Sequence, residues 1–144
     1  MRVLTLGLLA SLHITAAAAD GVVTYATSDS FGDVTFAVEN AIIGKGLVID
    51  YVSHTGEMLA RTKADVGGSK DLFEAADVFL FCSASLSRQV MEVDPMNIAH
   101  CPYAVFVADQ AGEVIVGYRE MPEGAMQEVQ ALLDDIAREA AGVE

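Results

Sequence analysis

Two alternating segments in the second half of the chain constrain the fold most strongly. Pro102–Ala108 and Glu113–Tyr118 alternate well enough to form two β-strands. Only the residues from Asp109 to Gly112 lie between them, which predicts a four-residue hairpin connection. Two strands joined by so short a connection must run antiparallel, so the sheet that contains them is expected to be mostly antiparallel.

The rest of the chain reads as strands alternating with helices. Pro122 is expected to open a C-terminal amphipathic helix that Gly142 closes. The other predicted elements are strands at Val22–Thr27, Leu47–Val52 and Ala75–Cys82, a helical turn around Met58, Leu59 and Arg61, and helices beginning at Ser30 and at Ser83 or Ser85. This order predicts an α+β domain in which helices pack on one face of a mostly antiparallel sheet.

The N-terminus has the pattern of a secretory signal peptide over residues 1–19. After a weakly basic start, Val3–Ile14 is mostly apolar and Ala16–Ala19 supplies an A-x-A ending. As a helix the apolar run covers about 18 Å, against about 30 Å for the hydrocarbon core of a bilayer, so no stable membrane insertion is expected. We therefore predict cleavage before Asp20, a periplasmic or secreted protein, and a single domain over residues 20–144.

Charge restricts the partners of the chain. It carries 8 Lys and Arg against 21 Asp and Glu, a net charge of −13, and loss of Arg2 with the leader would make this −14. Such a surface repels phosphate backbones, so no nucleic-acid partner is expected, while cations and basic proteins are favoured. Acidic residues are concentrated between Asp109 and Glu144, where they are expected to form a solvated face or to dock an exported partner protein.

Two stretches carry a resemblance to a known family. Residues 81–107 read F-C-S-A-S-L-S-R-Q-V-M-E-V-D-P-M-N-I-A-H-C-P-Y-A-V-F-V, and V-I-V-G-Y-R follows after a short turn. Upstream, residues 46–59 read G-L-V-I-D-Y-V-S-H-T-G-E-M-L. From about Val22 to Ala140 the chain resembles the family known as domain of unknown function 302 (DUF302), and looks like an exported branch of it. The resemblance implies an α+β sheet similar to TATA-binding-protein-like folds and often a homodimer, but it implies no catalytic role.

The sequence contains none of several recognised catalytic motifs. H-E-x-x-H, C-x-x-C, C-x-x-C-H and G-x-S-x-G do not occur, so a zincin, a thioredoxin-type redox pair, c-type haem attachment and a serine hydrolase are not indicated. Gly67 and Gly68 lack the spacing of a phosphate-binding loop. An enzyme is therefore the least favoured function, and no catalytic residue is assigned.

His54 is the main candidate ligand of a cofactor or metal. It follows an apolar strand and stands four residues before Met58, so the two side chains are expected on one face of a short helix. Imidazole and thioether suit soft or borderline centres, which predicts binding of haem b or copper. In the alternative, His54 caps the sheet edge and Met58 fills the core. A haem also needs an apolar crevice and cations, for which the candidates are Phe73, Phe79 and Phe81 with Arg61, Lys63 and Arg88.

The two cysteines lie at the end of one predicted strand and just before another. Strand ends can meet, and an exported protein is in an oxidising compartment, so a disulfide between Cys82 and Cys101 is one prediction. Two reduced buried thiols, or a reactive or metal-binding pair, are the alternatives. His100 and Cys101 are not expected to share a metal, because adjacent residues of an extended chain point to opposite faces.

Three functional hypotheses follow. The first is an exported module that binds a small ligand, with His54 as the primary ligand of haem or a soft metal. The second is an accessory partner of an exported complex, docked through its acidic C-terminal face. The third is a thiol redox protein in which Cys82 reacts and Cys101 resolves the mixed disulfide.

Overall fold

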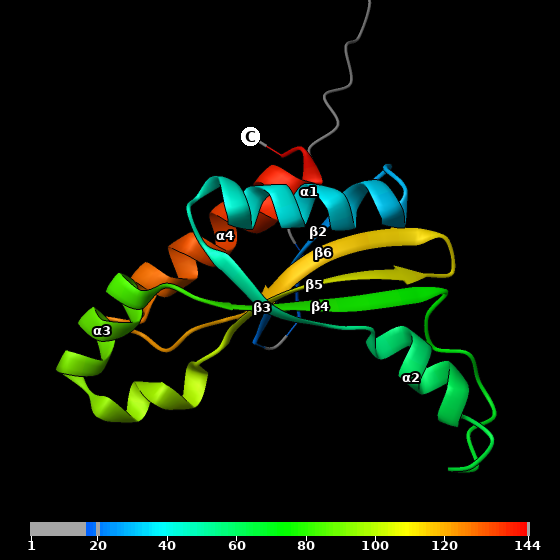
Figure 1. Ribbon diagram of the computed structural model, residues 1–144. Coiled ribbons are helices and arrows are strands. Elements are labelled where there is room, and N and C mark those ends of the chain that lie inside the picture. Colours follow the sequence, from blue (N-terminus) through cyan, green and yellow to red (C-terminus); the bar gives the residue numbers. More distant parts are fainter. Residues whose placement is uncertain (1–16, 20, 144) are drawn as a thin grey trace, which may run out of the picture.

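The computed structural model describes residues 17–19 and 21–143 and shows one sheet with helices around it (Figure 1). The sheet has six strands in the order β1-β2-β6-β5-β4-β3, and all neighbouring strands are antiparallel. The strands are β1 (Ala17–Ala19), β2 (Val22–Thr27), β3 (Val48–Ser53), β4 (Ala75–Cys82), β5 (Tyr103–Gln110) and β6 (Glu113–Arg119). The helices are α1 (Phe31–Gly44), α2 (Thr55–Thr62), α3 (Ala84–Val93), α4 (Gln127–Ala141) and the 3-10 helix η1 (Pro95–His100). The predicted α+β class is confirmed.

The hairpin between β5 and β6 is confirmed, but its connection is shorter than the predicted four residues. Only Ala111 and Gly112 separate the two strands. Both have positive φ, +56° and +84°, as a type I′ turn requires. The Asp109 carboxylate accepts a hydrogen bond from the Gly112 N–H at 3.0 Å, so a residue that suggested a longer loop instead stabilises the tight turn.

Helices α1 and α4 cover one face of the sheet, the upper face in Figure 1. Alternate residues of the strands point toward these helices and form the core. In β4 and β5 the buried core residues are Phe79, Phe81, Tyr103, Val105 and Val107. From α4 the core receives Val129, Leu133, Ile136 and Ala137, which belong to the apolar stripe that the sequence predicts. Burying a large apolar side chain contributes about 1.5–3 kcal/mol, so this layer holds the fold together.

The other helical segments border the opposite face of the sheet. Figure 1 shows α2 at one end of the strands and α3 with η1 at the other end, both extending below the sheet. The backbone of α2 approaches β4 closely at Gly56, where a Cβ atom would lie 2.5 Å from the backbone nitrogen of Ala76. The prediction of helices on one face therefore describes α1 and α4, while α2 and α3 lie at the ends of the other face.

The C-terminal helix begins later than the sequence predicts. Pro122 does not open it, because α4 starts at Gln127. Gly124 has φ +90°, outside the helical range, so the helix cannot extend back through it. The Gln127 side-chain amide instead donates to the carbonyl oxygens of Met121 (3.0 Å) and Pro122 (3.2 Å). The predicted end is confirmed, since Gly142 forms a left-handed cap with φ +67°.

The predicted signal peptide lies mostly outside the described residues. Of residues 1–19 the structure describes only β1, and Asp20, which follows the predicted cleavage site, is not described. In the described part of the chain no helix is both long and apolar enough to cross a membrane. Export therefore stays a prediction.

Candidate functional site

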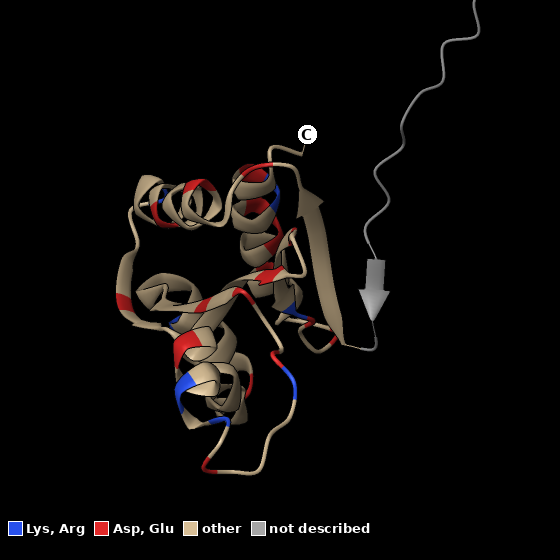
Figure 2. Ribbon diagram, turned by 90° about the vertical axis from the view of Figure 1, so that its right-hand side faces the viewer, with Lys and Arg blue, Asp and Glu red and all other residues tan. Residues whose placement is uncertain are grey.

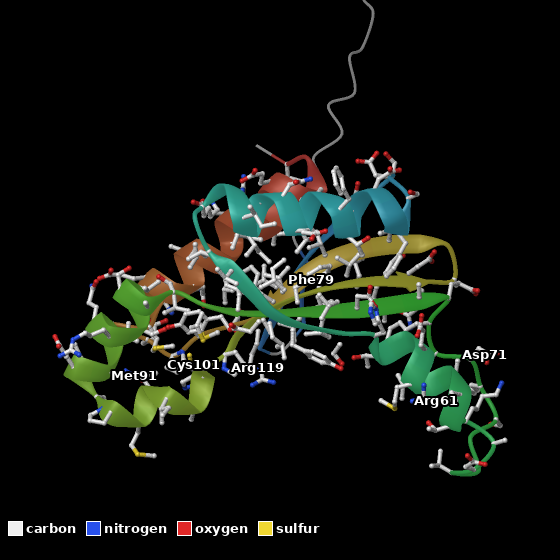
Figure 3. The ribbon with its side chains drawn as sticks, in the orientation of Figure 1. Arg61, Asp71, Phe79, Met91, Cys101 and Arg119 are labelled. Carbon is white, nitrogen blue, oxygen red and sulfur yellow. The ribbon has the colours of Figure 1, made fainter. Side chains whose placement is uncertain are left out.

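The face of the sheet opposite α1 and α4 contains a hollow of about 560 Å³, which we call the open-face hollow. Its floor comes from the strands: Val22, Val78, Leu80, Ala104, Phe106 and Arg119. Its wall comes from the end of η1 and the segments beside it: Ala99, His100, Cys101, Pro102 and Met121. Figure 3 shows Cys101 and Arg119 on the side of the sheet opposite to Phe79, which is a core residue.

Strand register explains why these residues share one face. Leu80 pairs with Ala104 and Arg119 pairs with Val22, so side chains from neighbouring strands form rows across the sheet. In the adjacent row Phe106 pairs with Gly117, where a Cβ atom would lie 2.8 Å from the Phe106 ring. The glycine therefore leaves room for the Phe106 ring to lie over the neighbouring strand and form part of the floor.

The wall corrects one expectation about His100 and Cys101. Both residues line the open-face hollow, although alternation along an extended chain predicted opposite directions. The physical reason is local structure: His100 is the last residue of η1, and Cys101 is its C-cap, so the chain is not extended through both. The structure therefore places both residues at one wall of the hollow.

Arg119 gives the hollow a cationic rim. Its side chain is exposed, and among the described residues it makes no hydrogen bond or ion pair. No Asp or Glu is present among the described residues that line the hollow. This environment contrasts with the rest of the chain, which has a net charge of −13 and whose acidic residues are spread over helices and loops in Figure 2.

The two cysteines meet beside the hollow. Cys82 ends β4, Cys101 precedes β5, and their sulfur atoms lie 2.8 Å apart as unbonded thiols. The Sγ of Cys101 is also 3.8 Å from the hydroxyl of Ser87, which lies 2.9 Å from the Tyr103 hydroxyl. The strand ends therefore bring the predicted pair together, while the disulfide itself stays a prediction.

Burial makes Cys82 a weak nucleophile in its reduced form. Removal from water, followed by the hydrogen bond and charge of Cys101, raises the pKa of Cys82 to about 11. Since the thiolate and not the thiol attacks disulfides, few Cys82 side chains are reactive at neutral pH. This argues against the hypothesis that Cys82 starts a thiol exchange reaction.

His54 and Met58 lie away from the hollow, at the start of α2. The Nδ1 atom of His54 is 2.8 Å from a carboxylate oxygen of Asp77. This hydrogen bond, with the negative charge of Asp77, raises the pKa of His54 above its usual value. The side chain of His54 is 58% exposed and Met58 is 42% exposed, so Met58 does not fill the core as the alternative proposed.

The haem crevice suggested by the sequence does not form from the proposed residues. Phe79 and Phe81 are buried in the core below α1 and α4, whereas Phe73 lines a separate hollow of about 290 Å³ beside α2. Strand alternation explains the error, because the two residues of β4 face the covered side. The proposed cations are also separated, since Lys63 pairs with Asp71, Arg88 pairs with Glu92, and Arg61 lies on α2 (Figure 3). The described residues contain no cluster of three or more His, Cys, Asp or Glu side chains suited to a metal.

The acidic C-terminal face is only partly solvated. Lys45 of α1 pairs with Asp135 at 3.6 Å and with Glu139 at 3.9 Å on the surface. Asp134, in contrast, points inward and accepts hydrogen bonds from the hydroxyls of Tyr25 and Tyr118. Of the adjacent carboxylates Asp134 and Asp135 on α4, the first therefore forms hydrogen bonds inside the fold and the second lies on the surface.

The sequence patterns did not indicate the open-face hollow or a role for Arg119. The available signal was that β4 and β5 are apolar on both faces, since Val78, Leu80 and Phe106 alternate with core residues. A strand with one face in water normally alternates apolar and polar side chains. The exception indicates a second apolar surface, and none of the helices at residues 21–143 covers the part of it that forms the hollow.

The fold and the hollow define a small α+β domain with one covered and one open sheet face. Residues 23–143 match the family described as Domain of unknown function DUF302, and the chain belongs to this family. The structure is similar to the crystal structure of an uncharacterized conserved DUF302 protein from Bacillus stearothermophilus, with a TM-score of 0.61 and 15% sequence identity. The similarity covers 86% of this chain and 95% of that chain, and at this identity it concerns the fold alone. No curated protein matches the sequence significantly.

Proposed function

We propose that this protein is an exported module that binds a small apolar molecule in the open-face hollow. The observation that carries the proposal is an apolar floor on a sheet face that none of the described helices covers. The volume of about 560 Å³ lies in the range of small-molecule sites, which is about 300–1,000 Å³. A ligand that covers Leu80 and Phe106 removes apolar surface from water, with a gain of about 25 cal/mol per Å² buried.

Binding of Nile red, a neutral hydrophobic dye, tests this proposal. We expect wild-type protein to bind the dye saturably with one site per chain. Leu80→Asn places an amide in the floor and should weaken binding at least tenfold. Ile115→Asn is the matched control, because Ile115 lies on the same face of the sheet as Leu80 but does not line the hollow. This change should alter dye binding by less than twofold. No saturable binding by the wild type, or equal losses in the two variants, would contradict the proposal.

Export is the second part of the proposal, and it is supported by the sequence of residues 1–19. The apolar run and the A-x-A ending are the features that signal peptidase recognises. Mass spectrometry of protein recovered from the periplasm or medium should give a chain that begins at Asp20. An intact Met1 in that fraction, or a chain that stays in the membrane, would contradict export.

Soft-metal binding at His54 and Met58 is a second candidate function, favoured by Asp77. Metal-binding histidines usually hydrogen-bond a carboxylate through the other ring nitrogen, which fixes the tautomer and the ring orientation. The contact between Asp77 and the Nδ1 of His54 is of this kind and leaves Nε2 for a ligand. Copper(I) fits a site with one imidazole and one thioether better than haem does, since the crevice for a haem is missing at these residues.

A homodimer, which the family resemblance implies, is favoured by the edge strand β3. Val48 is 73% exposed and Tyr51 is 64% exposed on this strand. Exposed apolar residues on an unpaired strand edge are a common site of self-association. Sedimentation velocity should give a dimer for the wild type and a monomer for Tyr51→Lys, and a wild-type monomer at high concentration would contradict the dimer.

A further inference from the structure

We infer that the natural ligand of the open-face hollow is an amphipathic carboxylate, whose anionic end is bound by Arg119 and whose apolar part lies on the floor. This inference rests on the proposed function and adds the chemical class of the ligand. It depends on three features of the site: the direction of Arg119, a lining in which no described residue is a carboxylate, and the extent of the apolar floor.

The direction of Arg119 follows from strand pairing. Arg119 is the last residue of β6 and pairs with Val22, which lines the same hollow. Its neighbour Tyr118 is a buried core residue, so alternation directs Arg119 to the open face. Figure 3 shows Arg119 below the sheet, beside the segment that contains Cys101.

Three other cations of the chain, unlike Arg119, have carboxylate partners among the described residues. Lys45, Lys63 and Arg88 make ion pairs with carboxylates. Arg119 makes none among the described residues, and no described carboxylate lines the hollow with it. In a chain with 21 acidic residues and 8 basic ones, an unpaired guanidinium beside an apolar floor is suited to an external anion.

The guanidinium of Arg119 determines which ligand headgroup binds, and the apolar floor determines which ligand tail binds. Arginine presents N–H donors in a planar fork that can bind both oxygens of a carboxylate. From β6 to β4 the floor crosses two strand spacings, about 10 Å, along Ala104 and Leu80. One exposed cation in water gives a small inorganic anion little affinity, so binding requires the apolar part of the ligand as well.

Displacement of Nile red by three compounds with the same ten-carbon chain tests the inference. Decanoate, decanol and decyltrimethylammonium are compared below their micellar concentrations, with acetate as the anion that lacks a tail. For the wild type we expect decanoate to bind about tenfold more tightly than decanol, decyltrimethylammonium to bind most weakly, and acetate not to compete. Naphthoate, added as a further competitor, then shows whether the hollow binds an aromatic carboxylate more tightly than an aliphatic one.

The variant Arg119→Gln separates the headgroup contact from the apolar contact. It should remove the tenfold preference for decanoate, so that decanoate and decanol bind with similar affinity. Arg61→Gln, which removes an arginine on α2 outside the hollow, should leave all affinities unchanged. Equal affinities of decanoate and decanol for the wild type, or the same loss in both variants, would overturn the inference while the hollow still binds the dye. If the wild type binds neither dye nor decanol, the proposed function fails as well.

Discussion

The two faces of the sheet are both apolar, but only one of them is closed. On the covered face, α1 and α4 bury Phe79, Phe81 and their neighbours, and the inward carboxylate of Asp134 accepts hydrogen bonds from two tyrosine hydroxyls. On the open face, Leu80 and Phe106 are half-buried and the cation at the rim makes no ion pair with a described residue. The covered face therefore stabilises the fold, and the open face exposes apolar surface of the kind on which ligands bind.

Charge substitutions on the two faces give the largest expected difference. Leu133→Asp places a carboxylate in the covered core, where Leu133 has no exposed surface, and should lower the free energy of unfolding by about 4 kcal/mol or more. Leu80→Asp on the open face should cost about 1 kcal/mol, since water reaches this side chain. Urea denaturation followed by circular dichroism measures both. Equal losses in the two variants would show that the open face is as buried as the core.

Oxidation of Cys82 and Cys101 should stabilise the protein at the boundary of the open face. An exchange with oxidised glutathione passes two electrons from the thiols to that disulfide and releases two glutathione thiols. Closure of a loop of about 20 residues should contribute about 3 kcal/mol. The oxidised protein should take up no alkylating reagent without a reductant and should unfold at higher urea concentration, whereas Cys101→Ser should show no such shift. Stoichiometric labelling of both cysteines after oxidation would remove the disulfide from this account.

Alkaline pH should destabilise the covered face through Tyr118. Burial, followed by the hydrogen bond to Asp134, raises the pKa of Tyr118 far above its usual value. The folded state therefore keeps this proton where the unfolded state loses it. The stabilisation is complete below about pH 10 and falls above it by about 1.4 kcal/mol per pH unit for this tyrosine. Tyr118→Phe should cost about 1 kcal/mol at neutral pH and give a shallower fall in urea denaturation above pH 10, and an unchanged slope would contradict the assignment.

His54→Ala should have the smallest effect on stability and should sharpen the choice between ligand sites. If His54 and Met58 bind copper(I), this change should remove most of the affinity, and Met58→Ala should reduce it less. His100→Ala, at the wall of the open-face hollow, should leave copper binding unchanged. Titration of copper(I) and of haem into the three variants and the wild type gives the test. No binding by the wild type, or equal binding by His54→Ala, would remove the metal proposal without affecting the open-face hollow.

Local sequence patterns predict most elements of this fold but not the proposed ligand-binding surface. The strands Val22–Thr27 and Ala75–Cys82 have the predicted bounds, because their side chains alternate or are continuously apolar. The start of α4 is wrong by five residues, since nothing in the pattern reveals the left-handed Gly124. The hollow is formed by single residues from different strands, and the register of these strands is set by the whole sheet. The sequence therefore suggests that β4 is apolar on both faces, but it cannot place Arg119 beside β4.

Nuclear magnetic resonance of methyl groups in the presence of decanoate tests the central claim most directly. Methyl resonances of Val78, Leu80 and Ala104, which lie on the open face, should show nuclear Overhauser effects to the bound ligand. Those of Val105, Val107 and Leu133, which lie in the covered core, should show none. Contacts confined to the open-face methyls are the predicted result, while contacts to α2 or to the core, or none at all, would contradict the claim that the open face is the ligand site.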